Sequence, residues 1–128
     1  MTTFDAVVLR TIEETPDART LVFDLTPASA DYRAGQFVTI DPHQFPGLRG
    51  FVDYLEHLKG RKEAPRAYSM CSAPNEPHVA VTVKEEFYEA GRTKYPPLLS
   101  GFLVHQLRPG DRLAIRGFAG GYTLPDDV

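Results

Sequence analysis

Apolar and polar residues alternate in several short segments of this chain, and this alternation limits the fold more than any other feature. Successive side chains of a strand point to opposite faces, so alternation gives one buried and one exposed face. The strand-like segments lie at residues 4–14, 19–25, 35–40, 78–84 and 112–116, and in a run that starts at residue 66 and stops at Pro74. Such closely spaced strands, with few helices between them, predict a mainly β fold, a small antiparallel barrel of six strands.

One stretch between two of these strands has helical spacing instead. Within residues 42–64 a proline-containing loop leads to apolar residues spaced three or four apart, which Gly60 ends: Phe51, Tyr54, Leu55 and Leu58. This spacing predicts a short amphipathic helix, inserted into the barrel sequence. Its C-terminal cations, Lys59, Arg61 and Lys62, are explained by the helix dipole.

A second short helix is expected at residues 101–107, after the fifth strand. Ser100 stands where an N-cap is favoured, and the apolar face is formed by Phe102, Leu103 and Leu107. The turn residues that follow, from Arg108 to Asp111, end this helix before the last strand.

Length and composition restrict the class of protein. A chain of 128 residues with 42% hydrophobic residues forms one domain with a real core. The net charge of −3 and the lack of a basic stripe argue against nucleic acid as a partner. One cysteine cannot form an intramolecular disulfide or a cysteine-based zinc site. With no long apolar run at the N-terminus, we expect a cytoplasmic protein that is not bound to a membrane.

The run that starts at Arg66 carries unusual chemistry for a strand. Arg66 and Tyr68 are two residues apart and share a face, which places a cation suited to phosphate beside a ring suited to a planar heterocycle. Ser69 adds a hydroxyl but points to the other face, so it reaches the same ligand only if the strand twists or bulges. The alternative interpretation is an ordinary strand with a surface arginine and a half-buried tyrosine.

The order of these motifs resembles the flavin-binding domain of the ferredoxin–NADP reductase family, which includes the reductase components of oxygenases. The matching pieces, in family order, are Gly35-Gln36-Phe37-Val38, Arg66-Ala67-Tyr68-Ser69, Ser72-Ala73-Pro74, Val81-Thr82-Val83-Lys84, Ser100 before a helix, Leu107-Arg108-Pro109-Gly110-Asp111, and Gly117-Phe118-Ala119-Gly120 with Tyr122 and Leu124. The resemblance covers nearly the whole chain apart from residues 42–64. It implies a Greek-key arrangement of the six-stranded barrel, with one capping helix.

The resemblance also implies roles for single residues. Arg66 would hold the flavin phosphate or pyrophosphate, with Ala67 in the same motif. Tyr68 would pack its ring on the isoalloxazine, and Ser69 would hydrogen-bond the reactive ring nitrogen. Val83 and Lys84 would line the ribityl and phosphate side, mainly through backbone. The amides from Ser100 and Gly101 would meet the pyrophosphate, since free amides at a helix N-terminus favour anions.

Three departures from the family pattern concern the phosphate end of the ligand. Pro97 replaces a glycine, and Phe118 replaces a proline of the closing glycine motif. The loop after Lys84 carries Glu85, Glu86 and Glu89. Like charge near a pyrophosphate is unfavourable, so these acids are expected to point outward.

The histidines and the cysteine are weaker candidates for a functional site. The histidines, His43, His57, His78 and His105, have no paired spacing with each other or with Cys71, so no metal site is expected. Cys71 lies close to the proposed flavin and is expected to be a small buried residue.

The functional expectation is the flavin-binding part of an NAD(P)H-dependent oxidoreductase. It would bind FAD rather than FMN and pass electrons from the nicotinamide cofactor to a redox protein such as an iron–sulfur protein. No segment of residues 1–128 offers the nicotinamide-nucleotide domain, so we expect that domain on another part of a longer protein or on a separate subunit. This chain alone would then be inactive towards NAD(P)H. The alternative is a flavin-free barrel that serves as a protein-interaction module, with the 42–64 helix as its docking surface.

Overall fold

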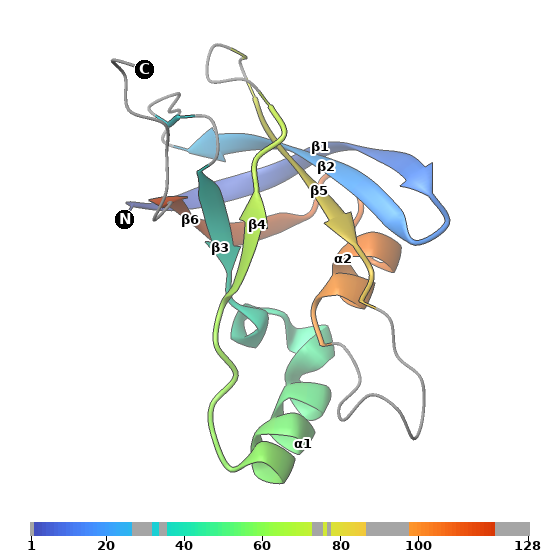
Figure 1. The fold of residues 1–128 in the computed structure, drawn as a ribbon, viewed down its shortest axis with the longest axis vertical. Coiled ribbons are helices and arrows are strands. Elements are labelled where there is room, and N and C mark those ends of the chain that lie inside the picture. Colours follow the sequence, from blue (N-terminus) through green and yellow to red (C-terminus); the bar gives the residue numbers. More distant parts are fainter. Residues whose placement is uncertain are drawn as a thin grey trace.

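A computed structural model of the chain describes residues 2–26, 32–33, 36–72, 76, 78–86 and 98–119. Six strands are present among these residues (Figure 1). They are β1 (Thr2–Thr15), β2 (Ala18–Thr26), β3 (Phe37–Ile40), β4 (Arg66–Ser69), β5 (Val79–Lys84) and β6 (Arg112–Ala119). The predicted roles of Gly35, Ala73, Pro74, Glu89, Pro97, Gly120, Tyr122 and Leu124 fall outside the described residues.

The strands form one antiparallel sheet in the order β4-β3-β6-β1-β2-β5. An additional antiparallel bridge joins Met70, just after β4, to Val81 of β5, which brings the two edges of the sheet together. The sheet is therefore a nearly closed six-stranded barrel in which neighbours in space are often distant in sequence. The predicted fold class is confirmed.

Alternating side chains fill the barrel as the pattern predicts. In β5 the three valines are buried, whereas Thr82 and Lys84 are exposed. The largest fully buried side chains come from several strands and from both helical regions: Phe23, Leu21, Ile40, Leu55, Leu99, Leu103 and Ile115. Burial of apolar area of this kind is the main favourable term in folding.

Helix α2 (Ser100–His105) packs against β5 at one end of the barrel (Figure 1). Its apolar side is formed by Leu103, Val104 and the following Leu107, all buried. Arg19 of β2 fixes the C-terminal end, because its Nη1 donates to the carbonyl oxygens of Leu103 (3.1 Å) and Val104 (2.7 Å). These carbonyls have no partner within the helix, so the guanidinium satisfies them and also matches the dipole.

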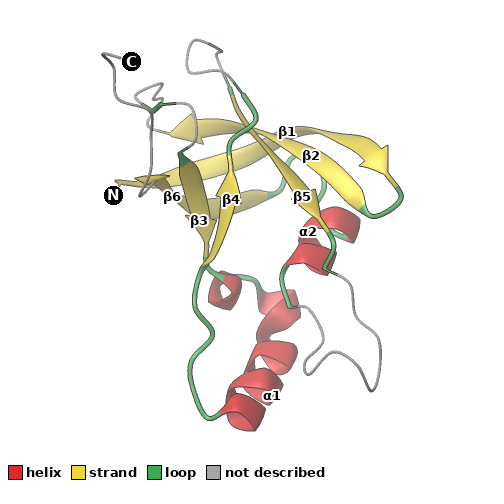
Figure 2. Cartoon of the chain, viewed as in Figure 1, coloured by secondary structure: helices red, strands yellow, loops and turns green. Residues whose placement is uncertain are grey.

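The inserted segment forms two short 3-10 turns, Pro42–Gln44 and Pro46–Leu48, and then α1 (Arg49–Lys59). Figure 2 shows α1 extending away from the strands, beyond the end of the barrel where α2 also lies. Gly60 ends the helix in the left-handed conformation with φ 72°, as its position predicts. The inserted helix is thus confirmed.

The buried side of α1 differs from the predicted apolar stripe. Val52 and Leu55 are buried, whereas Tyr54 is 57% and Leu58 51% exposed. The helix packs on the 3-10 turns, which cover only part of its apolar surface. In the described part of the chain, no helix is both long and apolar enough to span a bilayer.

Candidate functional site

Strand β4 places Arg66 and Tyr68 on one face, as its alternation predicts. Both are half-buried, whereas Ala67 and Ser69 are exposed. In the register with β3, Arg66 lies opposite Ile40 and Tyr68 opposite Val38, two core residues. The arginine and the tyrosine therefore face the barrel interior at the end where the insertion begins.

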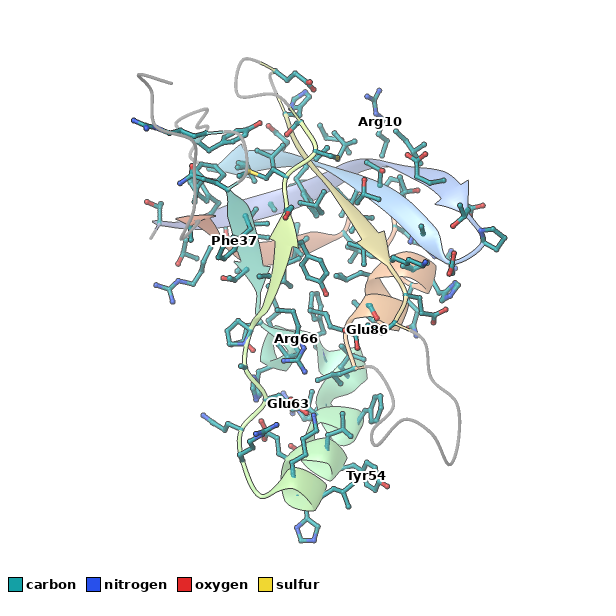
Figure 3. All side chains as sticks on the ribbon, in the orientation of Figure 1. Arg10, Phe37, Tyr54, Glu63, Arg66 and Glu86 are labelled. Atoms are coloured by element: carbon teal, nitrogen blue, oxygen red, sulfur yellow. The ribbon has the colours of Figure 1, made fainter. Side chains whose placement is uncertain are left out.

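The guanidinium of Arg66 is held by the chain just before its own strand. Nη1 donates to the carbonyl oxygen of Ala64 at 2.6 Å, and Nη2 donates to Glu63 Oε2 at 3.1 Å. Figure 3 shows Arg66 and Glu63 where the barrel meets the inserted segment. An arginine has five N–H donors in a planar fork, so these two contacts leave donors for an anion.

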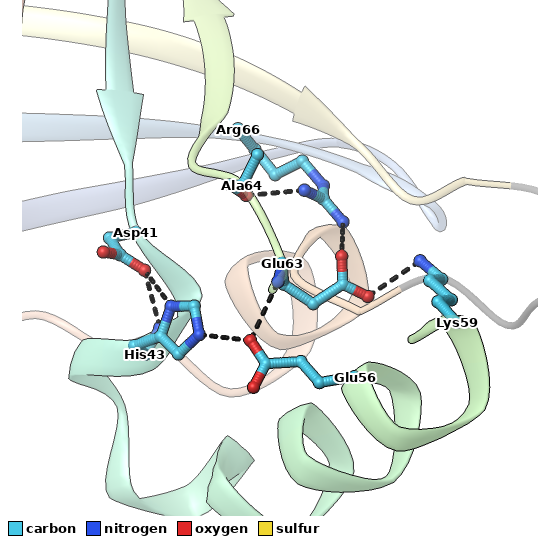
Figure 4. Close-up of polar contacts among 7 residues, drawn as sticks. All are labelled: Asp41, His43, Glu56, Lys59, Glu63, Ala64 and Arg66. Atoms are coloured by element: carbon cyan, nitrogen blue, oxygen red, sulfur yellow. Dashed lines mark hydrogen bonds and ion pairs between the residues drawn. The ribbon is translucent and has the colours of Figure 1, made fainter. Parts of the chain in front are cut away.

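Glu63 is a carboxylate placed between two cations (Figure 4). Its Oε1 accepts from Lys59 Nζ at 2.7 Å, and its side chain is only 4% exposed. Burial opposes ionisation of Glu63, but the hydrogen bonds from Lys59 and Arg66 outweigh it and lower the pKa. Glu63 is therefore a buried anion at neutral pH.

A chain of polar contacts continues from Glu63 to β3. The Glu63 amide donates to Glu56 Oε2 at 2.8 Å, and that oxygen lies 2.6 Å from His43 Nε2. His43 Nδ1 lies 2.6 Å from Asp41 Oδ1 (Figure 4). Hydrogen bonds that the His43 ring donates to the Asp41 carboxylate, and then to the Glu56 carboxylate, raise the pKa of His43. This chain fixes α1 relative to the segment that leads into β4.

Tyr68 is in an environment that keeps its hydroxyl protonated. Burial, and then the charge of Glu86, raise its pKa to about 12, against an opposing effect of Arg66. The ring packs at the edge of the core cluster. The charges of Arg66, on its own strand, and of Glu86, just after β5, thus both act on a neutral phenol whose ring lies at the edge of the core.

Ser69 lies on the opposite face from Arg66 and Tyr68. The β3–β4 pairing runs without a register shift from Ile40↔Arg66 to Phe37↔Ser69, so no bulge turns its hydroxyl. The flavin contact of Ser69 stays a prediction. Cys71 is exposed, so the expectation that it is buried is wrong. The Cys71 amide still donates to the Ala80 carbonyl of β5 at 2.8 Å, and its side chain lies beside the exposed Thr82, whose hydroxyl donates to Sγ at 3.5 Å.

The second group of predicted residues gathers where β5 meets α2. Val83 is buried in the core and leaves only its backbone for a ligand, whereas Lys84 is exposed. The charge of Lys84, after the hydrogen bond from Thr15, helps to lower the pKa of Asp17 in the β1–β2 turn. Lys84 therefore lies near that turn.

Ser100 is the first residue of α2 and not its N-cap. Leu99 holds the cap position without a side-chain hydrogen bond. The Ser100 hydroxyl is buried and accepts from the Glu86 amide at 3.0 Å. The Ser100 hydroxyl thus serves the end of β5 and not the start of the helix. The Glu86 amide lies beyond the strand and has no partner in the sheet ladder, so it donates to this hydroxyl. The N-cap prediction is wrong, and the phosphate role of this segment stays a prediction.

Glu85 does not point away from α2. Its Oε1 lies 3.1 Å from His105 Nε2, and its Oε2 would be 3.0 Å from a Cβ at Gly101. The glycine thus lets the carboxylate lie against the start of the helix, where it pairs with His105 one turn later. The expectation that this acid points outward is wrong.

Sequence reasoning missed two residues that organise this end of the barrel, Glu63 and Arg19. Glu63 stands four residues after Lys59 and three before Arg66, a spacing that brings opposite charges together near a helix end. Arg19 is two residues from Leu21 and four from Phe23 on the same strand, so it shares their inward face, and this spacing could have identified it. Among the described residues, no three His, Cys, Asp or Glu side chains are grouped as metal ligands.

The chain is similar to several known proteins in sequence or in structure. No protein-family model matches the chain. The flavohemoprotein of Halalkalibacterium halodurans is 31% identical over 100 residues, which are 78% of this chain and 21% of that protein. Ferredoxin–NADP+ reductase from Plasmodium falciparum has a TM-score of 0.64 at 20% identity, over 98% of this chain and 42% of that one.

A third similar structure is the flavohem-like FAD/NAD-binding domain of nitric oxide dioxygenase from Vibrio cholerae. It has a TM-score of 0.64 at 22% identity, over 96% of this chain and 47% of that one. The chain thus spans less than half the length of these relatives. The resemblance predicted from the motifs is confirmed. The chain has the barrel fold of the flavin-binding domain of ferredoxin–NADP reductases and flavohemoproteins.

Proposed function

We propose that this chain binds a flavin, FAD rather than FMN, at the end of the barrel where Arg66 and Tyr68 share a face. The observation that carries the proposal is the guanidinium of Arg66, which is fixed by Glu63 and Ala64 but keeps donors for a phosphate. Arginine forks suit phosphate oxygens, and the ring beside it suits a planar heterocycle. The residues present fit the group.

Each predicted residue has a stated task in this proposal. Arg66 holds a phosphate and Tyr68 packs on the ring system, with Ala67 between them. Ser69 donates to or accepts from the ring edge if the ligand extends to the exposed face of β4. The backbone of Val83 and Lys84 and the amides of Ser100 and Gly101 line the phosphate side.

A bound flavin supplies hydride and electron transfer, and the protein binds and orients it. The relatives support a flavin-dependent NAD(P)H oxidoreductase as the class of the whole protein. We propose that a nicotinamide-nucleotide domain or subunit donates to the flavin and that a redox protein, such as an iron–sulfur protein, accepts the electrons.

The visible spectrum of the purified chain, before and after addition of FAD and of FMN, tests the proposal. We expect a yellow protein whose released cofactor is FAD by chromatography. A chain that stays colourless with both flavins would contradict it. Dye reduction with NADH or NADPH should be negligible, because reaction requires both partners in near-attack geometry. A robust rate would reveal a nicotinamide site in this chain.

One observation favours a second function, a protein-interaction module without flavin. Tyr54 and Leu58 of α1 expose apolar surface, which is the kind of surface that partners cover. The two functions differ in one measurement, because only the first predicts saturable quenching of flavin fluorescence by the chain.

A further inference from the structure

We propose that Glu63 is a specificity-determining residue, which lowers the affinity of Arg66 for the doubly charged phosphate monoester of FMN and so favours the pyrophosphate of FAD. This inference rests on the flavin-binding function proposed above. It assigns a task to the inserted segment, which contains Glu63 and Lys59.

The charges around Arg66 limit the anion that this arginine can hold. Glu63 accepts from both Lys59 (2.7 Å) and Arg66 (3.1 Å), so two cations share one carboxylate and the charge of Arg66 is already partly compensated. Glu63 is 4% exposed, whereas Arg66 is 30% exposed. The carboxylate is thus fixed inside and the arginine is open to a ligand.

Further acids act on the same end of the barrel. The charge of Glu86 reaches Tyr68, whose pKa it raises after burial. Glu85 lies against Gly101 at the start of α2. A ligand phosphate near Arg66 therefore meets a cation that Glu63 partly compensates, with the charge of Glu86 acting on the neighbouring Tyr68.

Two flavin cofactors present different charges to such a site. A phosphate monoester carries about −1.5 to −2 on one phosphorus at pH 7. The pyrophosphate of FAD is a diester with one charge on each phosphorus, so its charge is spread over two groups. Repulsion by a fixed carboxylate grows with the local charge, and it is weakly screened when the carboxylate is buried. Glu63 should therefore disfavour FMN more than FAD.

Titration of Glu63→Gln with FAD, FMN and riboflavin tests the proposal. The amide keeps an acceptor for Arg66 but removes the charge. We expect the affinity for FMN to rise about fivefold or more above that of the parent chain. The affinity for FAD should change by about twofold at most, and the affinity for riboflavin should not change. Because the Glu63 carboxylate is buried, the gain for FMN should shrink only slightly at 1 M salt. Asp53→Asn, which removes an exposed carboxylate of α1 in the same inserted segment, is the matched control and should alter none of these.

Lys59→Gln provides a variant with the opposite expected sign, and it keeps the test valid if Glu63→Gln fails to fold. Removing Lys59 leaves the whole charge of Glu63 to Arg66, so FMN should bind several-fold more weakly than to the parent chain. Weaker FMN binding in Glu63→Gln, or equal changes for FMN and FAD, would overturn the proposal and make Glu63 only a support for Arg66. If the parent chain binds no flavin, the proposed function itself fails.

Discussion

Two arginines join the barrel to its helical regions, and the barrel uses them differently. Arg19 is buried, and its contacts are two main-chain carbonyls at the end of α2. Arg66 is 30% exposed, and its contacts are one carbonyl and the carboxylate of Glu63. The first arginine is enclosed by the fold, whereas the second is fixed by the fold but remains open at its surface.

The difference separates an arginine that stabilises from one that is available for binding. Arg19 is buried together with the carbonyls of Leu103 and Val104 that it contacts. A ligand therefore cannot reach its guanidinium without opening the core. Arg66 keeps free donors at the rim, where a phosphate can share it with Glu63. The comparison predicts large effects on folding at Arg19 and large effects on ligand affinity at Arg66.

Arg19→Met should give the largest effect on stability. The substitution keeps most of the side-chain volume but leaves the carbonyls of Leu103 and Val104 without their donor. Unsatisfied buried groups cost about 1–3 kcal/mol each, so we expect the free energy of unfolding to fall by about 2–4 kcal/mol, measured by urea denaturation.

Arg10→Met provides the matched control, because Arg10 is an exposed arginine on neighbouring β1. Exposed substitutions usually change stability by about 0.5 kcal/mol or less. Equal effects of the two substitutions would show that the α2 contact contributes little and would break the comparison.

Arg66→Ala should give the complementary result. Loss of a charge-assisted contact costs about 1.5–3 kcal/mol, which lowers flavin affinity by roughly tenfold to hundredfold. The fold should lose about 1 kcal/mol or less, since the ion pair is partly exposed and Glu63 keeps Lys59. Fluorescence titration with FAD and thermal melts without ligand measure the two effects. Unchanged FAD affinity would remove the centre of the proposed function.

Substitutions of Tyr68 should affect both stability and flavin affinity, because the ring packs against the core and also faces the proposed ligand. Tyr68→Ala removes a half-buried ring and should cost about 2 kcal/mol of stability as well as flavin affinity. Tyr68→Phe keeps the ring and removes only a hydroxyl that stays protonated, since the pKa is about 12. It should bind FAD within about twofold of the parent chain. A large loss in Tyr68→Phe would show that the hydroxyl, and not the ring, contacts the ligand.

The barrel was predictable because the apolar residues that alternate along each strand are the residues that the barrel buries. Val79, Val81 and Val83 alternate in the sequence and are buried in the fold. Arg66 and Tyr68 share a face for the same reason. These features depend on the backbone period alone, which sequence shows directly.

What the sequence did not predict depends on how elements pack and where long side chains turn. The apolar stripe of α1 is wider than the surface that covers it, so the helix buries Leu55 and leaves Tyr54 exposed. Ser100 stands at a helix start, but its hydroxyl serves an amide of Glu86, fourteen residues away in sequence. Contacts between separate elements of this kind have no local pattern.

His43 should give the smallest effect, and one that depends on pH, unlike the effect of Arg19. Contacts with Asp41 and then Glu56 raise the pKa of His43 above its ordinary value of 6.5. A group whose pKa is raised in the folded state stabilises fully below its unfolded pKa, and this contribution disappears as the pH rises through the folded value. The stability difference between the parent chain and His43→Gln should therefore be largest near pH 6 and shrink as the pH rises above 6.5.

Thermal melts at pH 6.0 and at pH 8.5 measure this difference, which should amount to a few degrees at most because the pair is partly exposed. The pKa values of Asp41 and Glu56 are lowered, so their own contributions are lost only as the pH falls into the acid range, below the chosen window. The loss in Arg19→Met should be equal at both pH values, since a guanidinium does not titrate there. A difference for His43→Gln that stays constant from pH 6.0 to 8.5 would show that the histidine supports α1 by packing and not by its charge.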